Sequence, residues 1–370
     1  MEQREIKIMI SGGGTGGHVF PAIAIAKALE AKLDNIRFLF VGAKGRMEME
    51  KVPAAGYDIE ALNISGFQRK LSLKNVSFPF KLLFSMMKAR KLVKRFKPDV
   101  VVGVGGYASG PVLRVAARKK IPTLIQEQNS FPGITNRILS KSADRICVAY
   151  DNMEKFFPKE KIFLTGNPVR QEVIAMKTDK KEALEYFKLN PDKKTVLIVG
   201  GSLGARSINL GVKEALEELI KQDIQLIWQT GKHYIDEGKK AVQDLNTDNV
   251  YVTDFISRMD MAYPAVDLIV SRAGAIAISE IQGVKKPAIL VPSPNVAEDH
   301  QTKNAMALVN YHAAVLVKDQ SAVRELGDAI LKLINHEQEL LKLNENISKL
   351  AKKNAADSIA SVILDMIEIK

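Results

Sequence analysis

Short apolar runs rich in β-branched residues alternate with longer helical stretches along the whole chain. The segment Asp-Val-Val-Val-Gly-Val at 99–104 is one such run, and buried parallel strands have this continuously apolar character. Regular alternation of this kind is typical of βα units wound around a parallel sheet. A single core seldom extends beyond about 250–300 residues, so a chain of 370 residues is expected to form two domains.

The alternation predicts two groups of strands, separated by a pause near 166–168. The first group is expected at Ile6–Ile10, Arg37–Val41, Ile59–Leu62, Val100–Val104, Thr123–Gln126, Arg145–Ala149 and Ile162–Leu164. The second is expected at Thr195–Val199, Leu226–Trp228, Val250–Thr253, Leu268–Val270, Ala288–Val291 and Ala314–Val317. We predict an α/β fold of two Rossmann-like, doubly wound domains facing across a cleft, over residues 1–166 and 167–370. The tail from Ala322 onward is helical, and its terminal helix belongs either with the second domain or packed back on the first.

Glycine-rich turns follow several of the predicted strands. The segments are Ser-Gly-Gly-Gly-Thr-Gly-Gly-His at 11–18, Gly-Val-Gly-Gly-Tyr-Ala-Ser-Gly-Pro at 103–111, Gly-Gly-Ser-Leu-Gly-Ala-Arg at 200–206 and Ser-Arg-Ala-Gly-Ala at 271–275. Glycine lets a phosphate approach main-chain N–H groups closely, and the start of the following helix adds further N–H groups and a positive dipole end. One such turn is weak evidence, but four in corresponding positions predict phosphate binding in both domains.

The first turn also satisfies the dinucleotide spacing, through Gly12, Gly14 and Gly17. A site for NAD needs an acidic residue after the second strand, and the segment Val41–Arg46 contains none. This counts against NAD. A site for NADP stays open, because Lys44 and Arg46 suit a 2′-phosphate.

The charge of the chain is strongly biased within the first half. Lys and Arg number 54 against 42 Asp and Glu, a net charge of +12, and no acidic residue lies between Glu60 and Asp99. A helix beginning near Pro79 has a predicted core stripe, formed by Leu82, Met86, Ala89, Val93 and Phe96. Further apolar side chains then lie among lysines, and the predicted membrane patch comprises Val76, Phe80, Leu83, Met87, Lys81 and Lys88.

Apolar side chains ringed by cations are typical of a site that contacts an anionic membrane surface. The alternative is an ordinary helix whose second apolar stripe packs on a neighbour. Nucleic acid is not expected as a partner, because no nucleic-acid-binding motif accompanies the charge.

Other classes of site and location are disfavoured by composition. Cys147 is the only cysteine and lies in an apolar run, which predicts a buried thiol in a reducing compartment. The five histidines are far apart without a metal-binding motif, so no metal site is expected. No run approaches the roughly 18 apolar residues that span a bilayer, and the N-terminus lacks a signal-peptide layout. Membrane contact is therefore expected to be peripheral.

Polar residues lie beyond several strand ends, where a doubly wound sheet binds its ligands. They include Glu127, Gln128 and Asn129 after one strand, and Arg170 at the domain junction. Each has a simpler interpretation as a solvated loop or surface residue, and the spacing alone leaves both open.

Taken in order along nearly the whole chain, these segments resemble the MurG family of bacterial glycosyltransferases. The motifs are Gly-Gly-Thr-Gly-Gly-His-Val-Phe-Pro-Ala (13–22), Gly-Gly-Tyr-Ala-Ser-Gly-Pro (105–111), Glu-Gln-Asn (127–129), Gly-Asn-Pro-Val-Arg (166–170), Gly-Gly-Ser-Leu-Gly-Ala-Arg (200–206) and Ala-Gly-Ala…Ser-Glu (273–280). The resemblance implies a GT-B fold and inverting transfer of GlcNAc from UDP-GlcNAc to the 4-hydroxyl of undecaprenyl-diphospho-muramoylpentapeptide. It also implies a role in peptidoglycan synthesis, cell shape and division, and a peripheral location on the cytoplasmic face of the cell membrane. No cofactor is implied.

The same resemblance assigns residues to substrates. By position, the second domain would hold the nucleotide and the first would meet the lipid acceptor. The implied substrate-binding residues are Thr15, Gly16, Gly17, Asn129, Arg170, Ser202, Ile256 (through its backbone), Ala275, Glu280 and Gln301. A helix start at 202–206 would stabilise the departing UDP. The base for the acceptor hydroxyl is expected to be His18, with Glu127 as the competitor, and His18 has the alternative role of binding the acceptor diphosphate.

Two other functions compete with this hypothesis. A UDP-GlcNAc 2-epimerase shares the two-domain fold but has no need of the acid-free basic helix. A peripheral membrane adaptor with an inert nucleotide fold would bind no UDP-sugar at all.

Overall fold

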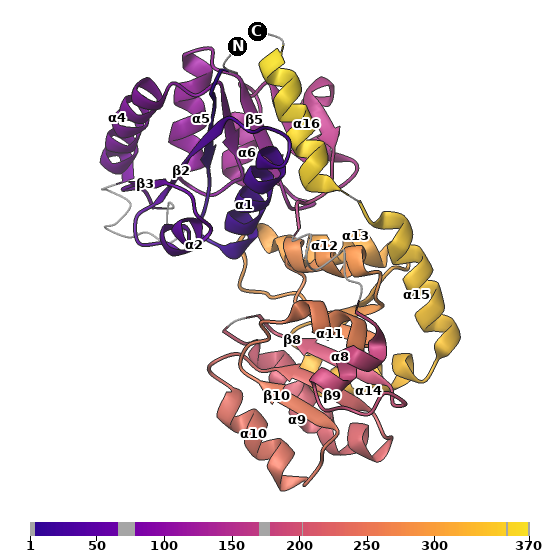
Figure 1. Ribbon diagram of the computed structural model, residues 1–370. Helices are drawn as coiled ribbons and strands as arrows, with labels where there is room; N and C mark the ends of the chain where they lie inside the picture. The colour runs from indigo at the N-terminus through magenta and orange to yellow at the C-terminus, as the bar shows by residue number, and fades with distance from the viewer. Residues whose placement is uncertain (1–3, 66–77, 170–177, 202, 353, 369–370) are drawn as a thin grey trace. The chain divides into compact units, whose positions relative to one another are not determined.

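A computed structural model of the chain describes residues 4–65, 78–169, 178–201, 203–352 and 354–368. The chain divides into two compact units (Figure 1). The first unit comprises Met1–Val169 and Lys353–Lys370, and the second comprises Arg170–Lys352. The first unit thus ends at Val169 and not at residue 166, and it also includes the C-terminal segment of the chain.

The first unit is built on a parallel sheet of seven strands in the order β3-β2-β1-β4-β5-β6-β7. The strands are β1 (Ile6–Ser11), β2 (Ile36–Ala43), β3 (Ile59–Leu62), β4 (Val100–Gly103), β5 (Thr123–Glu127), β6 (Arg145–Val148) and β7 (Ile162–Leu164). Its helices are α1 (Gly16–Glu30), α2 (Glu48–Ala54), α4 (Phe78–Phe96), α5 (Ser109–Arg118), α6 (Ile134–Leu139), the short η1 (Met153–Lys155) and η2 (Lys159–Lys161), and α16 (Ala355–Glu368). The order reverses between β1 and β4, which is where such sheets bind ligands.

Side-chain alternation along the strands divides the core of this unit between the two faces of the sheet. Ile8 and Ile10 of β1 pack with residues of α1 and α16. Met9, between them, packs with residues of α4 and α5 on the other face. The C-terminal helix α16 therefore completes the first unit by packing beside α1 (Figure 1). Cys147 of β6 lies in this core, fully buried, as the sequence predicted.

The second unit repeats the arrangement with six parallel strands in the order β10-β9-β8-β11-β12-β13. The strands are β8 (Thr195–Val199), β9 (Gln225–Gln229), β10 (Val250–Thr253), β11 (Leu268–Ser271), β12 (Ala288–Leu290) and β13 (Val315–Leu316). The helices are α8 (Lys180–Tyr186), α9 (Arg206–Lys221), α10 (Ile235–Asp244), α11 (Met259–Ala265), α12 (Ala275–Val284), the short η3 (Ala297–Asp299), α13 (His300–Val309), α14 (Ala322–Ile334) and α15 (Glu337–Leu350). Its reversal point lies between β8 and β11.

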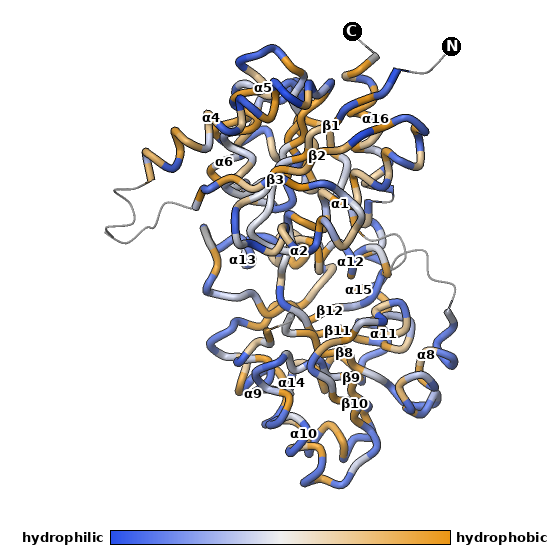
Figure 2. The backbone as a smooth tube through the Cα atoms, turned by 60° about the vertical axis from the view of Figure 1, so that its left-hand side comes forward, coloured by the Kyte–Doolittle hydropathy of each residue, from blue (hydrophilic) through white to orange (hydrophobic). Residues whose placement is uncertain are grey.

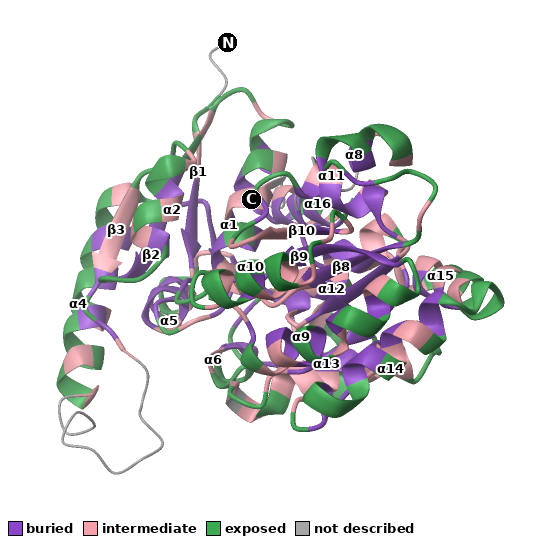
Figure 3. Ribbon diagram, turned by 90° about the horizontal axis from the view of Figure 1, so that it is seen from below, coloured by how far each residue is buried: buried purple, intermediate pink, exposed green. Residues whose placement is uncertain are grey.

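The core of the second unit is visible as a buried sheet in Figure 3. One face of this sheet packs against α9 and α14, through residues such as Ile208, Val212 and Ile330. The strands predicted from the sequence are all present, with ends that agree to within two residues, and the helical tail is confirmed. The predicted pair of doubly wound α/β folds is likewise confirmed.

Candidate active site

The two glycine-rich turns at the reversal point of the first sheet, at 11–18 and 103–111, are in direct contact. A Cβ built on Gly106 would lie 2.4 Å from the Gly13 carbonyl oxygen, and Gly106 has a φ of +85°. Gly13 N–H donates to the Gly105 carbonyl at 3.3 Å. Only glycine fits this approach at position 106, so the sequence pattern reflects close contact between two turns as well as room for a ligand.

His18 lies in the first turns of α1, against the second glycine turn. Its Nδ1 is 3.0 Å from the Gly13 carbonyl oxygen and 3.3 Å from Thr15 Oγ1. The side of the ring that carries Nε2 lies beside Gly105, and a Cβ built on Gly105 would lie 2.8 Å from Nε2. A carbonyl oxygen only accepts hydrogen bonds, so Nδ1 is the protonated nitrogen of the neutral ring and Nε2 carries the lone pair.

A residue that the sequence analysis did not identify organises the first glycine turn. Glu48, the first residue of α2, is 1% exposed. Its Oε2 accepts from Gly14 N–H at 2.8 Å and its Oε1 accepts from Ala43 N–H at 2.9 Å. It follows the end of β2 by five residues and lies two residues beyond the carboxylate-free segment Val41–Arg46.

Glu127 is the last residue of β5 and is also 1% exposed. Its Oε1 accepts from the backbone and side-chain N–H groups of Asn129 at 3.0 and 3.2 Å, and its Oε2 accepts from Gly133 N–H and Asn136 Nδ2 at 3.2 and 2.8 Å. Burial raises the pKa of this carboxyl, and its four donors oppose that rise. The carboxylate shapes the loop that follows β5 and is not the solvated loop residue that the spacing allowed.

Amide side chains form a second buried network beside this loop. Gln126 Nε2 donates to Asn167 Oδ1 at 3.1 Å, and Asn167 Nδ2 donates to the Gln128 carbonyl at 3.0 Å. Gln128 Nε2 donates in turn to the Val104 carbonyl at 2.8 Å. The polar cluster after β5 is therefore structural support for the turn that contains Gly105.

In the second unit, the turns that contain Gly204 and Gly231 are in similarly close contact. A Cβ on Gly204 would lie 2.3 Å from the Thr230 carbonyl oxygen, and one on Gly231 would lie 2.1 Å from Gly204 N. Asn209 of α9 joins the turns, because it donates to the Thr230 carbonyl at 2.8 Å and accepts from Trp228 Nε1 at 3.0 Å. The turn at 200–206 is thereby anchored to β9.

A pocket of about 580 Å³ opens at the reversal point of the second sheet. Its lining includes Gly200, Gly204, Ala205, Arg206, Ser207, Leu210, Arg272, Ser293, Asn295, Gln301, Asp319 and Val323. Arg272 Nη1 pairs with Asp319 and donates to the Val291 carbonyl at 3.0 Å, and its Nη2 lies 3.2 Å from Ser207 Oγ. The start of α9 suits an anionic ligand such as a diphosphate, and the charge of Arg272 beside it is offset by Asp319.

The structure places the remaining predicted residues as follows. Gln301 lines the pocket, where its Oε1 accepts from Ser293 N–H at 2.8 Å. Glu280 is 6% exposed on α12, which begins at Ala275, and accepts from Tyr263 OH at 3.1 Å. The backbone N–H of Ile256 donates to Gln229 Oε1 at 2.9 Å.

Some predicted residues lie elsewhere. Thr15 precedes α1, and Gly16 and Gly17 begin that helix. Arg170, Ser202 and Val76 fall outside the described residues. Sequence reasoning missed Arg272, Ser207 and Asp319 as a group, because they come from three separate segments that only the sheet topology brings together.

Comparison with known proteins connects this geometry to a family. Residues 8–148 match the glycosyltransferase family 28 N-terminal domain, and residues 195–362 match the glycosyltransferase family 28 C-terminal domain. The chain belongs to glycosyltransferase family 28. It is 52% identical over 368 residues to the UDP-N-acetylglucosamine–N-acetylmuramyl-(pentapeptide) pyrophosphoryl-undecaprenol N-acetylglucosamine transferase of Flavobacterium psychrophilum, covering 100% of this chain and 99% of the relative.

Solved structures place the family 28 chain in the same fold. The crystal structure of MurG from Acinetobacter baumannii matches with a TM-score of 0.79 and 29% identity, over 97% of this chain and 99% of that one. A UDP-GlcNAc 2-epimerase from Neisseria meningitidis bound to UDP-GlcNAc matches with a TM-score of 0.67. At 17% identity over 98% of this chain and 100% of that one, the second likeness shows the fold alone.

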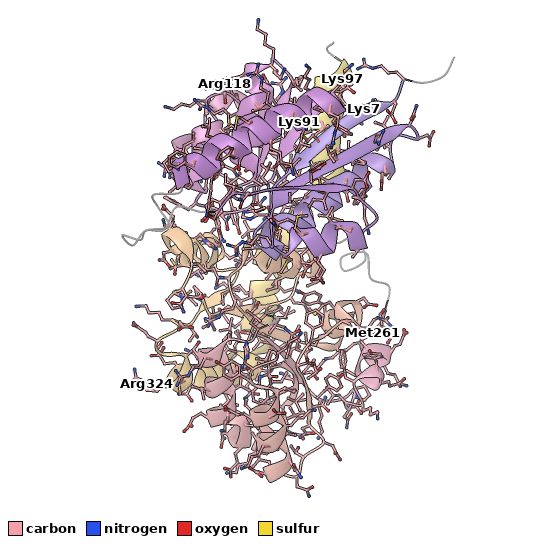
Figure 4. The ribbon with its side chains drawn as sticks, turned by 90° about the vertical axis from the view of Figure 1, so that its left-hand side faces the viewer. Lys7, Lys91, Lys97, Arg118, Met261 and Arg324 are labelled. Carbon is pink, nitrogen blue, oxygen red and sulfur yellow. The ribbon has the colours of Figure 1, made fainter. Side chains whose placement is uncertain are left out.

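Helix α4 of this family 28 chain exposes an apolar stripe. Phe80, Leu83, Phe84 and Met87 are 51–63% exposed, and Lys91 and Lys94 continue their spacing along the helix. Figure 4 faces this surface and labels Lys91 of α4 and Arg118 of α5. Orange and blue segments accordingly alternate along α4 in Figure 2.

One residue of the predicted α4 core stripe was wrong, because Leu82 is 37% exposed. Ala89 and Val93 are buried as predicted, Met86 and Phe96 are partly buried against the same core, and Ser85 and Leu92 complete the buried face. Lys88 is a partner of Glu60 at 3.2 Å and of the Ala61 carbonyl at 2.8 Å. Its charge is therefore offset within the unit, and Lys81 is half-buried.

The described residues contain neither a membrane-spanning helix nor a cluster of metal ligands. No helix there combines the length and apolarity that a membrane span requires. No cluster of three or more His, Cys, Asp or Glu side chains there is arranged to bind a metal ion.

Proposed function

We propose that this chain transfers N-acetylglucosamine from UDP-GlcNAc to the 4-hydroxyl of undecaprenyl-diphospho-muramoylpentapeptide. The proposal rests on one observation. Over its full length, the chain is 52% identical to a curated relative that is named for this transfer. Both family domains of the relative's class are present in order. The reaction builds the lipid-linked disaccharide of peptidoglycan, and through the cell wall it serves cell shape and division.

We infer that the pocket of the second unit binds the donor. Arg272 and the first turn of α9 lie where they would contact a diphosphate. As the bond between the anomeric carbon and UDP breaks, these groups stabilise the negative charge that develops on the diphosphate. Because the start of α9 supplies positive potential, we propose that the reaction needs no metal ion or cofactor.

We infer that His18 of the first unit is the base. In the reaction the acceptor oxygen attacks the anomeric carbon, UDP leaves from the opposite side, and Nε2 of His18 takes the hydroxyl proton. The Nδ1 contact to Gly13 leaves the lone pair on Nε2, as this role requires. Glu127 is a poorer candidate, since both of its oxygens accept hydrogen bonds from its own loop.

We propose that α4 brings the first unit to the membrane, where the lipid acceptor resides. Its exposed apolar side chains and its lysines suit the interface of an anionic bilayer. The protein would then be peripheral on the cytoplasmic face, beside its nucleotide-sugar donor.

The decisive experiment incubates the protein with labelled UDP-GlcNAc and a lipid-linked muramoyl-pentapeptide. We expect a labelled disaccharide lipid and release of UDP, both unaffected by EDTA. Interconversion of UDP-sugars without the acceptor would instead identify an epimerase. Absence of UDP-GlcNAc binding would favour the adaptor hypothesis.

A further inference from the structure

One peptide group links two buried or half-buried side chains at the first glycine turn. The peptide between Gly13 and Gly14 donates its N–H to Glu48 Oε2 at 2.8 Å. The carbonyl of the same peptide lies 3.0 Å from His18 Nδ1. Glu48 and His18 are therefore connected through a single planar unit, with no side-chain contact between them required.

The planarity of the peptide makes this connection directional. The N–H and C=O groups of a trans peptide point in opposite directions and rotate together. When Glu48 binds the Gly14 N–H, it also fixes the direction in which the Gly13 carbonyl points. A carboxylate on the N–H side further polarises the peptide and makes its carbonyl a stronger acceptor.

The space around Glu48 is shaped for its carboxylate. A Cβ on Gly13 would lie 2.2 Å from the carboxylate carbon of Glu48, and one on Gly42 would lie 2.4 Å from its Cγ. The second oxygen is held by Ala43 N–H at 2.9 Å. The side chain is thus confined on two sides by positions where only glycine fits, and it has one available orientation.

We propose that Glu48 is a positioning residue for His18, acting through the Gly13–Gly14 peptide to fix the tautomer that is protonated on Nδ1. The proposal rests on the base role of His18 proposed above. It also removes the Gly14 N–H from the groups that bind an acceptor phosphate, because that N–H already donates to a carboxylate.

The test is the tautomer of His18, measured by ¹⁵N NMR on the full-length protein labelled at histidine. The chain has five histidines, and a His18→Gln variant identifies the signal. In the wild-type protein at a pH where the ring is neutral, we expect the Nδ1–H form. The Nε2–H form, which free histidine prefers, would overturn the proposal without any variant of Glu48.

The Glu48→Gln variant tests the peptide link. Its amide nitrogen must face one of two donors, Gly14 N–H or Ala43 N–H. Where it faces Gly14 N–H, the hydrogen bond is lost and the Gly13 carbonyl loses its fixed direction. We expect a measurable fraction of the Nε2–H tautomer. Thr15→Val removes the other Nδ1 neighbour and should leave the tautomer unchanged. A matched control is Glu30→Gln, which neutralises the carboxylate that accepts from Tyr57 OH in the same unit.

Activity separates this inference from the proposed function. If both hold, kcat of Glu48→Gln falls by about 10- to 100-fold, as for groups that orient metal-bound histidines, and Glu30→Gln changes it little. If the tautomer changes but kcat does not, the peptide link stands and the base role of His18 fails. An unchanged tautomer in folded Glu48→Leu, which has no oxygen to accept from Gly14 N–H, contradicts the peptide link whatever the activity.

Discussion

Glu48 and Glu127 are both buried carboxylates near strand ends, and their hydrogen-bond donors distinguish them. Glu127 binds donors from the segment that immediately follows it, at residues 129–136. Glu48 binds a donor 34 residues away, at Gly14. The first contact organises one loop, whereas the second connects a helix after β2 to the turn after β1. Only the second reaches a histidine with a proposed chemical role.

Replacing Glu127 by Gln should destabilise the first unit. An amide nitrogen would face donors that now bind a carboxylate oxygen, leaving at least one buried N–H without a partner. We expect a loss of about 1–3 kcal/mol in the free energy of unfolding, measured by urea denaturation. Retained stability with kcat reduced 100-fold or more would instead support Glu127 as a catalytic residue.

The thiol of Cys147 should be unreactive in the native protein. Burial raises its pKa to about 12, and the reactive thiolate forms only as the pH approaches that value. At pH 8 we expect no reaction with a thiol reagent until the chain is unfolded in guanidinium, when the pKa falls back towards its ordinary value. Rapid labelling of folded protein at pH 8 would contradict the buried position in β6.

At the scale of elements, α4 shows how a helix divides its apolar residues between two surfaces. Ala89 and Val93 pack into the core, as predicted, while Leu82 does not. The helix packs against α5 and β3, and the apolar residues of its first turns, Phe80, Leu83 and Phe84, are exposed. Figure 3 shows exposed and buried residues side by side along it.

Neutralising two lysines of α4 should weaken binding to anionic vesicles. Lys91 and Lys94 continue the exposed stripe and make better targets than Lys88, which contacts Glu60. At about 1 kcal/mol each, their replacement by Gln should reduce the partition coefficient roughly 30-fold, measured by vesicle sedimentation. Lys239→Gln with Lys240→Gln on α10, both exposed, is the matched control. Equal effects of the two pairs would refute a specific α4 surface.

The close contact between the glycine turns of the first unit predicts that one added methyl group is destabilising there. Gly106→Ala would place a Cβ 2.4 Å from the Gly13 oxygen at a φ of +85°. We expect a cost of about 2 kcal/mol or more in unfolding free energy, together with reduced transfer activity. Gly133→Ala has a φ of −64° and nothing within 4 Å of the added Cβ, so it should be close to neutral. Similar stability of the two variants would contradict the described packing of the turns.

At the scale of the whole molecule, the chain forms two units whose boundaries do not follow the sequence order. The last helix, α16, packs beside α1, so residues at opposite ends of the chain share one core. Ile363 is fully buried with Ile8 and Ile25 in that core. Stability of the first unit therefore depends on a segment that follows the entire second unit.

Truncating Ile363 to Ala should destabilise the first unit selectively. A buried Ile-to-Ala change costs about 2–5 kcal/mol, so hydrogen exchange should accelerate in β1 and β4 while β8 and β11 stay protected. Ile330→Ala, at a fully buried position on α14, should give the reverse pattern. Faster exchange in both sheets of the Ile363 variant would show that the two units unfold together.

The strands, their arrangement in two doubly wound parallel sheets, and the glycine turns beyond them follow from the sequence by itself. Apolar runs, periodicity and glycine at strand ends are local properties, and local backbone preferences largely decide them. The roles of Glu48, Lys88 and the Arg272–Asp319 pair were decided only by the tertiary structure. Each depends on a contact between segments distant in the chain, and spacing along a sequence does not measure distance in space. Glu48 is the clearest example, because its partner at Gly14 is fixed by the pairing of β1 with β2.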